Sequence, residues 1–121
     1  SGKAPMFNRE ERVELIRQSI GDLPNVEVDS SDELLAEYAK RKGNCVIVKG
    51  LRAGSDFENE FQMALTNKKL NPDVETVFLT TSAENMYLSS SMVRQIASMG
   101  GDISDFVPDV IHKDILARLS K

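Results

Sequence analysis

The alternation of apolar and polar positions predicts helices and strands that follow one another along the chain. The first helix is predicted from Asn8 to Gly21, where apolar residues recur every three or four positions. Asn8 and Glu11 have the spacing of a capping box, in which each side chain accepts a hydrogen bond from the other residue's backbone N–H. Gly21 suits the end of this helix.

Further stretches with helical spacing cover residues 30–43, 55–70, 89–99 and 108–119. Ser30 and Glu33 have capping-box spacing at the first of these starts. Ser55 and Glu58 have the same spacing at the second start. The basic run Lys40-Arg41-Lys42 suits a helix C-terminus, where positive charge complements the helix dipole.

Short runs rich in β-branched residues predict strands at residues 25–28, 45–48 and 74–79. The second run is apolar without alternation, which is typical of a strand buried on both faces. Alternation of helices and strands predicts an α/β fold, with a parallel sheet that carries helices on both faces. The length of 121 residues predicts a single domain over residues 1–121.

The composition fits an ordinary globular protein, with 40% hydrophobic and 28% charged residues. No apolar run approaches the roughly 20 residues of a membrane-spanning helix, so no membrane partner is expected. The net charge of −4 disfavours nucleic acid as a partner. The single cysteine, Cys45, fits a buried thiol in a reducing, cytoplasmic compartment. One Cys and one His cannot build a zinc site, and no metal-ligand cluster is predicted.

Two cations and a glycine follow the second predicted strand directly, in the segment Lys49-Gly50-Leu51-Arg52. Ligands of open α/β sheets bind at the carboxyl ends of the strands. Lys49 would act there as a point charge and Arg52 as a planar fork for phosphate oxygens. The alternative is that both cations are solvated loop residues.

The serines of Ser89-Ser90-Ser91 open a predicted helix, where free backbone N–H groups and the helix dipole favour an anion. Arg94 lies one turn further on. These residues predict a phosphate cradle, and the alternative is an ordinary helix cap, because serine is a preferred N-cap residue.

An acidic run of Asp56, Glu58 and Glu60 occupies the first turns of another predicted helix. Negative charge complements the helix dipole there, and this explanation is favoured over a ligand site. Glu60 has no capping role, so it could also face a ribose or a base.

Together these segments resemble the bacterial phosphopantetheine adenylyltransferases. The blocks that carry the resemblance are residues 3–7, 48–53, 56–64 and 88–94, with support from residues 100–108. The Gly-Leu-Arg and Asp-Phe-Glu blocks at this spacing are specific. Leu-Ser-Ser-Ser-x-x-Arg is a signature of the wider nucleotidyltransferase superfamily. The similarity spans essentially all of the chain.

The resemblance implies a Rossmann-like sheet and a transferase of coenzyme A synthesis. Such an enzyme joins ATP to 4′-phosphopantetheine, giving dephospho-coenzyme A and pyrophosphate, with Mg²⁺ assisting. Its expected partners are these substrates, dephospho-coenzyme A or coenzyme A, and further copies of itself, because the family is typically hexameric.

The resemblance also assigns roles to individual residues. Lys3 and Arg52 would be catalytic, at the reacting phosphates. Lys3, Leu35 and Lys49 would bind 4′-phosphopantetheine. ATP would be bound by Gly50, Leu51, Arg52, Glu60, Ser89, Ser90, Ser91 and Arg94.

Two departures from the family pattern change the picture. Lys49 stands where the family commonly has Arg, so the charge is kept and the bidentate fork is lost. The family's opening strand, its Thr/His-x-Gly-His loop and its first helix do not occur here, so the first β–α unit is expected to be missing. This would explain the small number of strands and the helix that comes first.

Two alternatives to this assigned function remain open. The 121-residue chain alone is expected to be inactive, which leaves a catalytically incomplete fragment that only binds ligand or self-associates. The same chemistry on another small phosphate ester is the second alternative, and the segment Gly50-Leu51-Arg52 argues against it.

Overall fold

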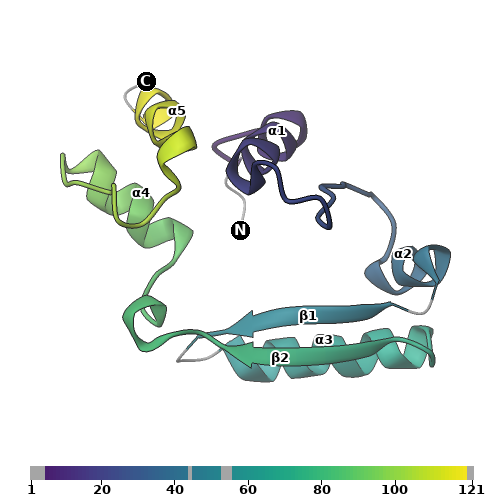
Figure 1. The fold of residues 1–121 in the computed structure, drawn as a ribbon. Helices are drawn as coiled ribbons and strands as arrows, with labels where there is room; N and C mark the ends of the chain where they lie inside the picture. The colour runs from purple at the N-terminus through teal and green to yellow at the C-terminus, as the bar shows by residue number, and fades with distance from the viewer. Residues whose placement is uncertain (1–4, 44, 53–55, 120–121) are drawn as a thin grey trace. The chain divides into compact units, whose positions relative to one another are not determined.

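The computed structural model describes residues 5–43, 45–52 and 56–119 (Figure 1). Its elements, in chain order, are α1 (Arg9–Ile20), α2 (Leu35–Lys42), β1 (Val46–Leu51), α3 (Asp56–Leu70), β2 (Glu75–Thr80), the 3-10 helix η1 (Ala83–Asn85), α4 (Ser90–Ser98) and α5 (Asp109–Leu119). None of the described helices is both long and apolar enough to cross a membrane.

The chain divides into two compact units, residues 1–30 with 88–121, and residues 31–87. The first unit contains α1, α4 and α5, and the second contains α2, both strands, α3 and η1. The single domain over residues 1–121 stays a prediction.

In the unit of residues 31–87, β1 and β2 pair in parallel, and α3 provides the connection between them (Figure 1). The register sets Val46 opposite Glu75 at one end and Leu51 opposite Thr80 at the other. Because the strands are parallel, their carboxyl ends meet at one edge of the sheet. The predicted α/β class with a parallel sheet is confirmed, as are the strands predicted at 45–48 and 74–79.

Aromatic side chains fasten α3 to one face of this sheet. The rings of Phe57 and Phe61 stack with centroids 5.7 Å apart, and Phe57 lies 6.1 Å from Phe78 of β2. The side chains on the opposite face are exposed, among them Val46, Val48, Val77 and Leu79. The prediction that β1 is buried on both faces is therefore wrong for the described residues. Its side chains alternate between exposed and half-buried, because α3 covers only one of the two faces.

Asn71 ties α2 to the turn between α3 and β2, and its side chain is almost fully buried. Its Nδ2 donates to the carbonyl of Ala36 at 3.1 Å, and its Oδ1 accepts from the N–H of Asp73 at 3.1 Å. Both ends of one short amide are thus satisfied inside the unit, which fixes α2 against the start of β2.

The helix boundaries of the other unit follow the sequence signals closely. The Asn8–Glu11 capping box is present, and Gly21 ends α1 with a positive φ of 58°. Ser89 caps α4 by accepting from the N–H of Met92 at 3.1 Å. After α4, the N–H and hydroxyl of Ser104 donate to Asp102 and hold the pKa of that carboxyl below its usual value.

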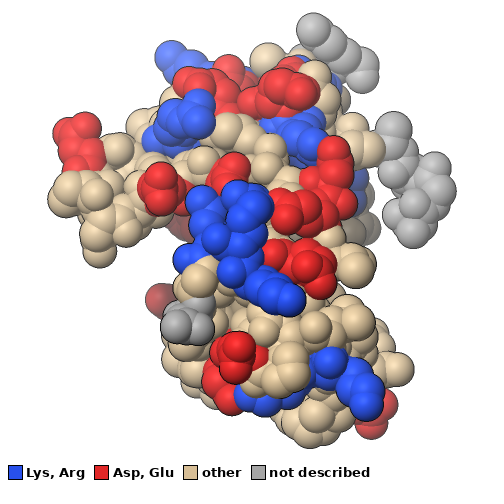
Figure 2. Space-filling view, turned by 90° about the vertical axis from the view of Figure 1, so that its right-hand side faces the viewer, with Lys and Arg blue, Asp and Glu red and all other residues tan. Residues whose placement is uncertain are grey.

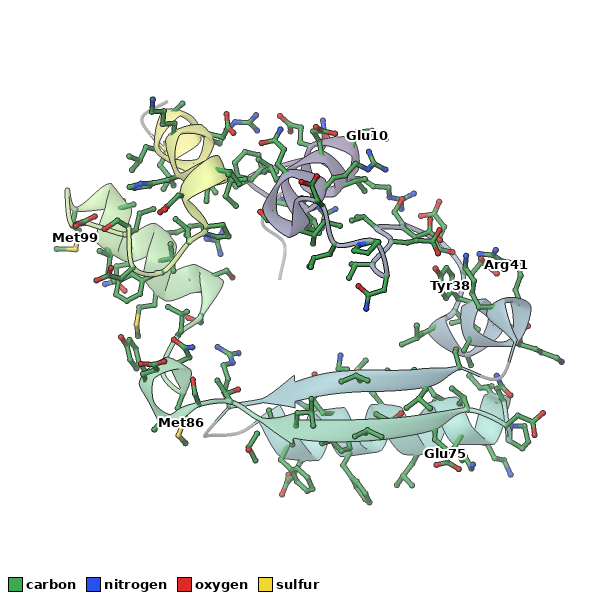
Figure 3. All side chains as sticks on the ribbon, in the orientation of Figure 1. Glu10, Tyr38, Arg41, Glu75, Met86 and Met99 are labelled. Carbon is green, nitrogen blue, oxygen red and sulfur yellow. The ribbon has the colours of Figure 1, made fainter. Side chains whose placement is uncertain are left out.

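Two further sequence predictions are wrong. Residues 25–28 form no strand, and they pair with no other described strand. The second helix begins at Leu35 and not after Ser30. Glu33, the expected capping-box partner of Ser30, instead pairs with Arg41 through a bidentate contact, with an Nη2–Oε1 distance of 2.6 Å. Arg41 also lies over the ring of Tyr38, 5.0 Å from its centroid (Figure 3). The capping box predicted at Ser55 lies outside the described residues.

We predict that Asn71→Ala lowers the free energy of unfolding by about 2–3 kcal/mol. The substitution removes two buried hydrogen bonds and leaves the Asp73 N–H without its acceptor. Asn85→Ala is the matched control, because the exposed Asn85 amide donates only to Ser82 at 3.1 Å, and a change within about 0.5 kcal/mol is expected. Urea denaturation measures both. Equal losses in the two variants would contradict the role given to Asn71.

Candidate functional site

A small cavity of about 10 Å³ lies between the sheet, α3 and α2. It is lined by Leu35, Ile47, Lys49, Glu60, Met63, Ala64, Asn67 and Thr76. Three residues of the predicted site thus meet here, namely Leu35, Lys49 and Glu60. The parallel register explains this meeting, since Ile47, Lys49 and their neighbour Thr76 point to the sheet face that α3 covers.

Lys49 and Glu60 form an ion pair at this cavity, with 3.1 Å between Nζ and Oε2. Their side chains are 34% and 24% exposed. The Oε2 atom of Glu60 is itself buried and accepts no hydrogen bond from the described residues, so the Lys49 ammonium is its compensating charge. The cation predicted to bind a phosphate is therefore held by a carboxylate, which a competing anion must displace.

The carboxyl edge of the sheet carries Gly50, Leu51 and Arg52. The Leu51 carbonyl accepts from both the N–H and the hydroxyl of Thr81, at 2.9 and 2.7 Å, which locks this edge to the end of β2. The space beside Gly50 is open: apart from the residue itself and its chain neighbours, no atom of the described residues lies within 4 Å of where a Cβ would stand, so a ligand can approach its backbone closely. Arg52 follows as an exposed side chain.

The serine triplet lies in the other unit, at the start of α4. Ser89 is engaged as the N-cap, while Ser90 and Ser91 are exposed in the first turn. The first intrahelical bond runs from the N–H of Val93 to the carbonyl of Ser89 at 3.1 Å, so the preceding N–H groups have no acceptor within the helix. Arg94 is half-buried one turn on. The helix cap is thus confirmed, and the phosphate cradle stays a prediction.

The predicted site residues therefore fall into three groups. The structure brings Leu35, Lys49 and Glu60 to one cavity. The segment Gly50-Leu51-Arg52 lies at the adjoining strand end, and the triplet with Arg94 belongs to the other unit. Lys3 lies outside the described residues.

The sequence did not indicate five of the cavity residues, namely Ile47, Met63, Ala64, Asn67 and Thr76. Those on α3 could have been found, because Met63, Ala64 and Asn67 follow Glu60 by three, four and seven positions and so share its face of the helix. Thr76 could not be found without the strand register, which places it opposite Ile47.

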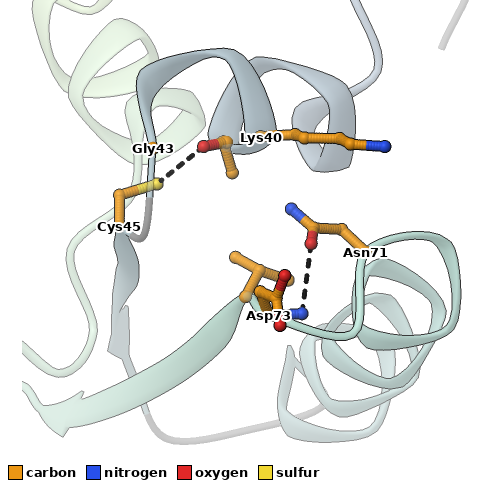
Figure 4. A pocket seen from close by; sticks show the side chains of 7 residues that line it. Lys40, Gly43, Cys45, Asn71 and Asp73 are labelled. Atoms are coloured by element: carbon orange, nitrogen blue, oxygen red, sulfur yellow. Dashed lines mark hydrogen bonds between the residues drawn. The ribbon is translucent and has the colours of Figure 1, made fainter.

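A second cavity, of about 90 Å³, lies between the end of α2 and the turn before β2 (Figure 4). Its wall includes Lys40, Gly43, Cys45, Asn71 and Asp73. The Cys45 Sγ is half-buried and lies 3.6 Å from the carbonyl of Ala39, which satisfies a weak thiol donor.

The described residues contain no group of three or more His, Cys, Asp or Glu side chains that could hold a metal ion. Magnesium usually keeps several waters and binds through one or two carboxylates together with substrate phosphates. The lack of a three-residue cluster among the described residues is compatible with a magnesium ion that arrives on substrate phosphates. On the face shown in Figure 2, basic and acidic side chains are interspersed rather than forming one continuous basic surface.

Comparison with known proteins gives a consistent result. Residues 1–96 match the cytidylyltransferase-like family. A phosphopantetheine adenylyltransferase from Caldanaerobacter subterraneus is 55% identical over 119 residues, which cover 98% of this chain and 74% of that protein. The phosphopantetheine adenylyltransferases of Heliobacterium modesticaldum and Aromatoleum aromaticum are each 50% identical over 98% of this chain, covering 68% and 73% of those proteins.

We predict that Lys49 and Glu60 are energetically coupled. In a double-mutant cycle with Lys49→Ala and Glu60→Gln, we expect a coupling free energy of about 1 kcal/mol, because the Glu60 oxygen is buried. The exposed pair Lys68–Glu75 is the control, and about 0.5 kcal/mol or less is expected for it. Urea denaturation of the four proteins of each cycle measures both values. Additive effects at Lys49 and Glu60 would show that the pair contributes nothing.

Proposed function

The chain belongs to the phosphopantetheine adenylyltransferases of the cytidylyltransferase-like family, and from this premise we propose that it transfers the adenylyl group of ATP to 4′-phosphopantetheine. The observation that carries the proposal is the identity of 55% with one such relative over nearly the whole chain. The meeting of Leu35, Lys49 and Glu60 at one cavity supports it, since the resemblance assigned all three to substrate binding.

The reaction forms one bond and breaks another. A phosphate oxygen of 4′-phosphopantetheine attacks the α-phosphorus of ATP, and the bond between the α-phosphorus and its bridging oxygen to the β-phosphate breaks. Pyrophosphate leaves with that electron pair, and dephospho-coenzyme A remains. No covalent bond to the protein is needed, so the protein contributes positioning and electrostatic stabilisation.

For 4′-phosphopantetheine, we propose that Lys49 binds the phosphate and Leu35 packs against the pantetheine arm. The two residues line the same small cavity. Lys3 would contact the phosphates at the reacting centre. A phosphate that approaches Lys49 must compete with Glu60, so substrate binding and rearrangement of the ion pair occur together.

For ATP, we propose that Arg52 binds its phosphates and offsets the negative charge that develops in the transition state. The open space beside Gly50 supports a close approach of the nucleotide to this strand end, where Leu51 would also contact it. Glu60 would bind the adenosine part of ATP once its ion pair with Lys49 has opened.

At the start of α4, the serines and one arginine would hold the remaining ATP phosphates. These residues are Ser89, Ser90, Ser91 and Arg94. The N–H groups of Ser90 and Ser91, which have no acceptor within the helix, support this role, because the N-terminus of a helix attracts anions.

We propose that Mg²⁺ is carried to the protein on the ATP phosphates, because magnesium is usually bound by substrate phosphates together with one or two carboxylates. ATP, 4′-phosphopantetheine and dephospho-coenzyme A are the expected ligands. The net charge of −4 supports the proposal that nucleic acid is not a partner. We further propose that the protein is a cytoplasmic homo-oligomer, because the family resemblance implies this location and this assembly.

The test of the function is acceptor specificity. We expect the whole natural protein to form dephospho-coenzyme A from ATP and 4′-phosphopantetheine, and to give no product with nicotinamide mononucleotide or choline phosphate. Chromatography of the products with pyrophosphate detection measures both. Turnover with another acceptor and none with 4′-phosphopantetheine would overturn the proposal. Binding of ATP by the 121-residue chain without turnover would identify that chain as the binding fragment.

We predict that Lys49→Ala raises the KM for 4′-phosphopantetheine about 10–100-fold while kcat changes little. A charge-assisted hydrogen bond to phosphate contributes about 1.5–3 kcal/mol, and it is lost in substrate and transition state alike. Lys49→Arg is the control, because it keeps the charge and restores a planar fork. Steady-state kinetics measures all three proteins. An unchanged KM in the alanine variant would remove Lys49 from the phosphate site.

A further inference from the structure

The Lys49–Glu60 ion pair leaves one carboxylate oxygen dependent on a single cation. Glu60 Oε2 is buried and lies 3.1 Å from Lys49 Nζ, and none of the described residues donates an aligned hydrogen bond to it. Lys49 is also the only cation among the described residues that line the cavity. A buried charge without compensation is strongly unfavourable, so Glu60 depends on Lys49 as long as no ligand is bound.

A phosphate that binds Lys49 changes the surroundings of Glu60. Lysine presents a compact point charge on one nitrogen, so the phosphate and the carboxylate would both approach the same atom. Two anions that share one cation repel each other. Glu60 therefore loses compensation when the phosphate binds, and it needs other donors. Its side chain is 24% exposed, so a ligand can reach it.

The adenosine part of ATP carries the donors that Glu60 then lacks. An ionised carboxylate only accepts hydrogen bonds, and the ribose hydroxyls and the adenine amino group can donate them. Lys49 belongs to β1 and Glu60 to α3 of the same unit, so both halves of the pair are available within one compact body. Opening the pair lowers the affinity of whichever ligand binds first. The second ligand finds the pair already open.

We propose that the Lys49–Glu60 ion pair couples the binding of the two substrates: 4′-phosphopantetheine on Lys49 raises the affinity for ATP at Glu60, and ATP raises the affinity for 4′-phosphopantetheine by the same factor. This inference rests on the proposed function, which assigns the phosphate to Lys49 and the adenosine part to Glu60. Coupling between two sites typically changes affinity about 5–150-fold. A single, partly exposed ion pair corresponds to the lower end, about five-fold.

The experiment is equilibrium binding to the whole natural protein, measured by isothermal titration calorimetry. The probe is an ATP analogue with a methylene group in place of the oxygen between the α- and β-phosphorus atoms, so no transfer occurs. We expect the dissociation constant of this analogue to fall about five-fold when 4′-phosphopantetheine is present at saturation. The dissociation constant of 4′-phosphopantetheine should fall by the same factor in the saturating analogue.

Glu60→Gln tests the ion pair itself. The amide is neutral and does not compete for the Lys49 ammonium group, so Lys49 is available to a phosphate before any nucleotide binds. This variant should therefore bind 4′-phosphopantetheine alone about five-fold more tightly than the unchanged protein does. The effect of each substrate on the affinity for the other should fall below about two-fold, because no ion pair remains to be opened.

Glu75→Gln is the matched control. It removes the same charge from the Lys68–Glu75 pair of the same unit, in which the Glu75 side chain is 66% exposed. Both dissociation constants and the coupling between them should stay within about two-fold of those of the unchanged protein.

Lys49→Arg provides the test if Glu60→Gln fails to fold. A guanidinium has enough donors in a fixed fork to hold a carboxylate and a phosphate together, so the phosphate no longer has to displace Glu60. Both ligands should still bind this variant, and the coupling should fall below about two-fold.

The outcomes separate this inference from the proposed function. Coupling of unchanged size in Glu60→Gln, or weaker binding of 4′-phosphopantetheine by that variant, would overturn the role of the ion pair. An analogue that binds the unchanged protein equally well with and without 4′-phosphopantetheine would overturn the coupling, while that protein still forms dephospho-coenzyme A. Absence of dephospho-coenzyme A formation by the unchanged protein would overturn the proposed function itself.

Discussion

The parallel pairing of β1 with β2 is the constraint on which the cavity and the strand-end loop depend. Its register puts Lys49 and Ile47 on the face covered by α3, and it brings Gly50 to the same edge as the end of β2. The side-chain period of a strand is two, so a slip by one residue would turn Lys49 to the exposed face. Glu60 would then keep a buried oxygen without a cation. The ion pair therefore specifies the register as well as resulting from it.

Sequence predicts best where a local signal decides the structure. The ends of α1 follow from Asn8 and Gly21, because a cap depends on residues within one turn. The strand predicted at residues 25–28 is wrong, because β-branched composition alone makes no strand. These residues pair with no other strand in the described structure. The start of α2 was missed since Glu33 pairs with Arg41, eight positions away, and a capping motif does not record that competitor.

In the candidate site, too, the identity of single residues could be predicted, while their arrangement depends on tertiary contacts. Leu35, Lys49 and Glu60 could each be named from sequence, by resemblance to a family, but their meeting depends on the crossover through α3. The position of Glu60 in the first turns of a helix favoured a helix-dipole role over a ligand site. The structure adds a specific partner, Lys49. Thr76 became a cavity residue only through pairing with β1, which no local pattern encodes.

Arg118 of α5 and Lys49 are each paired with a carboxylate, and the geometry of the two contacts differs. Arg118 presents a planar fork to Glu11 and the Met6 carbonyl, and several donors in fixed geometry resist rearrangement. Lys49 meets Glu60 through one ammonium group on a four-carbon stem, and no aligned hydrogen bond reaches the buried Glu60 oxygen. A point charge of this kind can exchange one anion for another by rotating its stem, at little geometric cost. The arginine therefore suits a persistent structural contact, and the lysine suits one that a substrate phosphate must open.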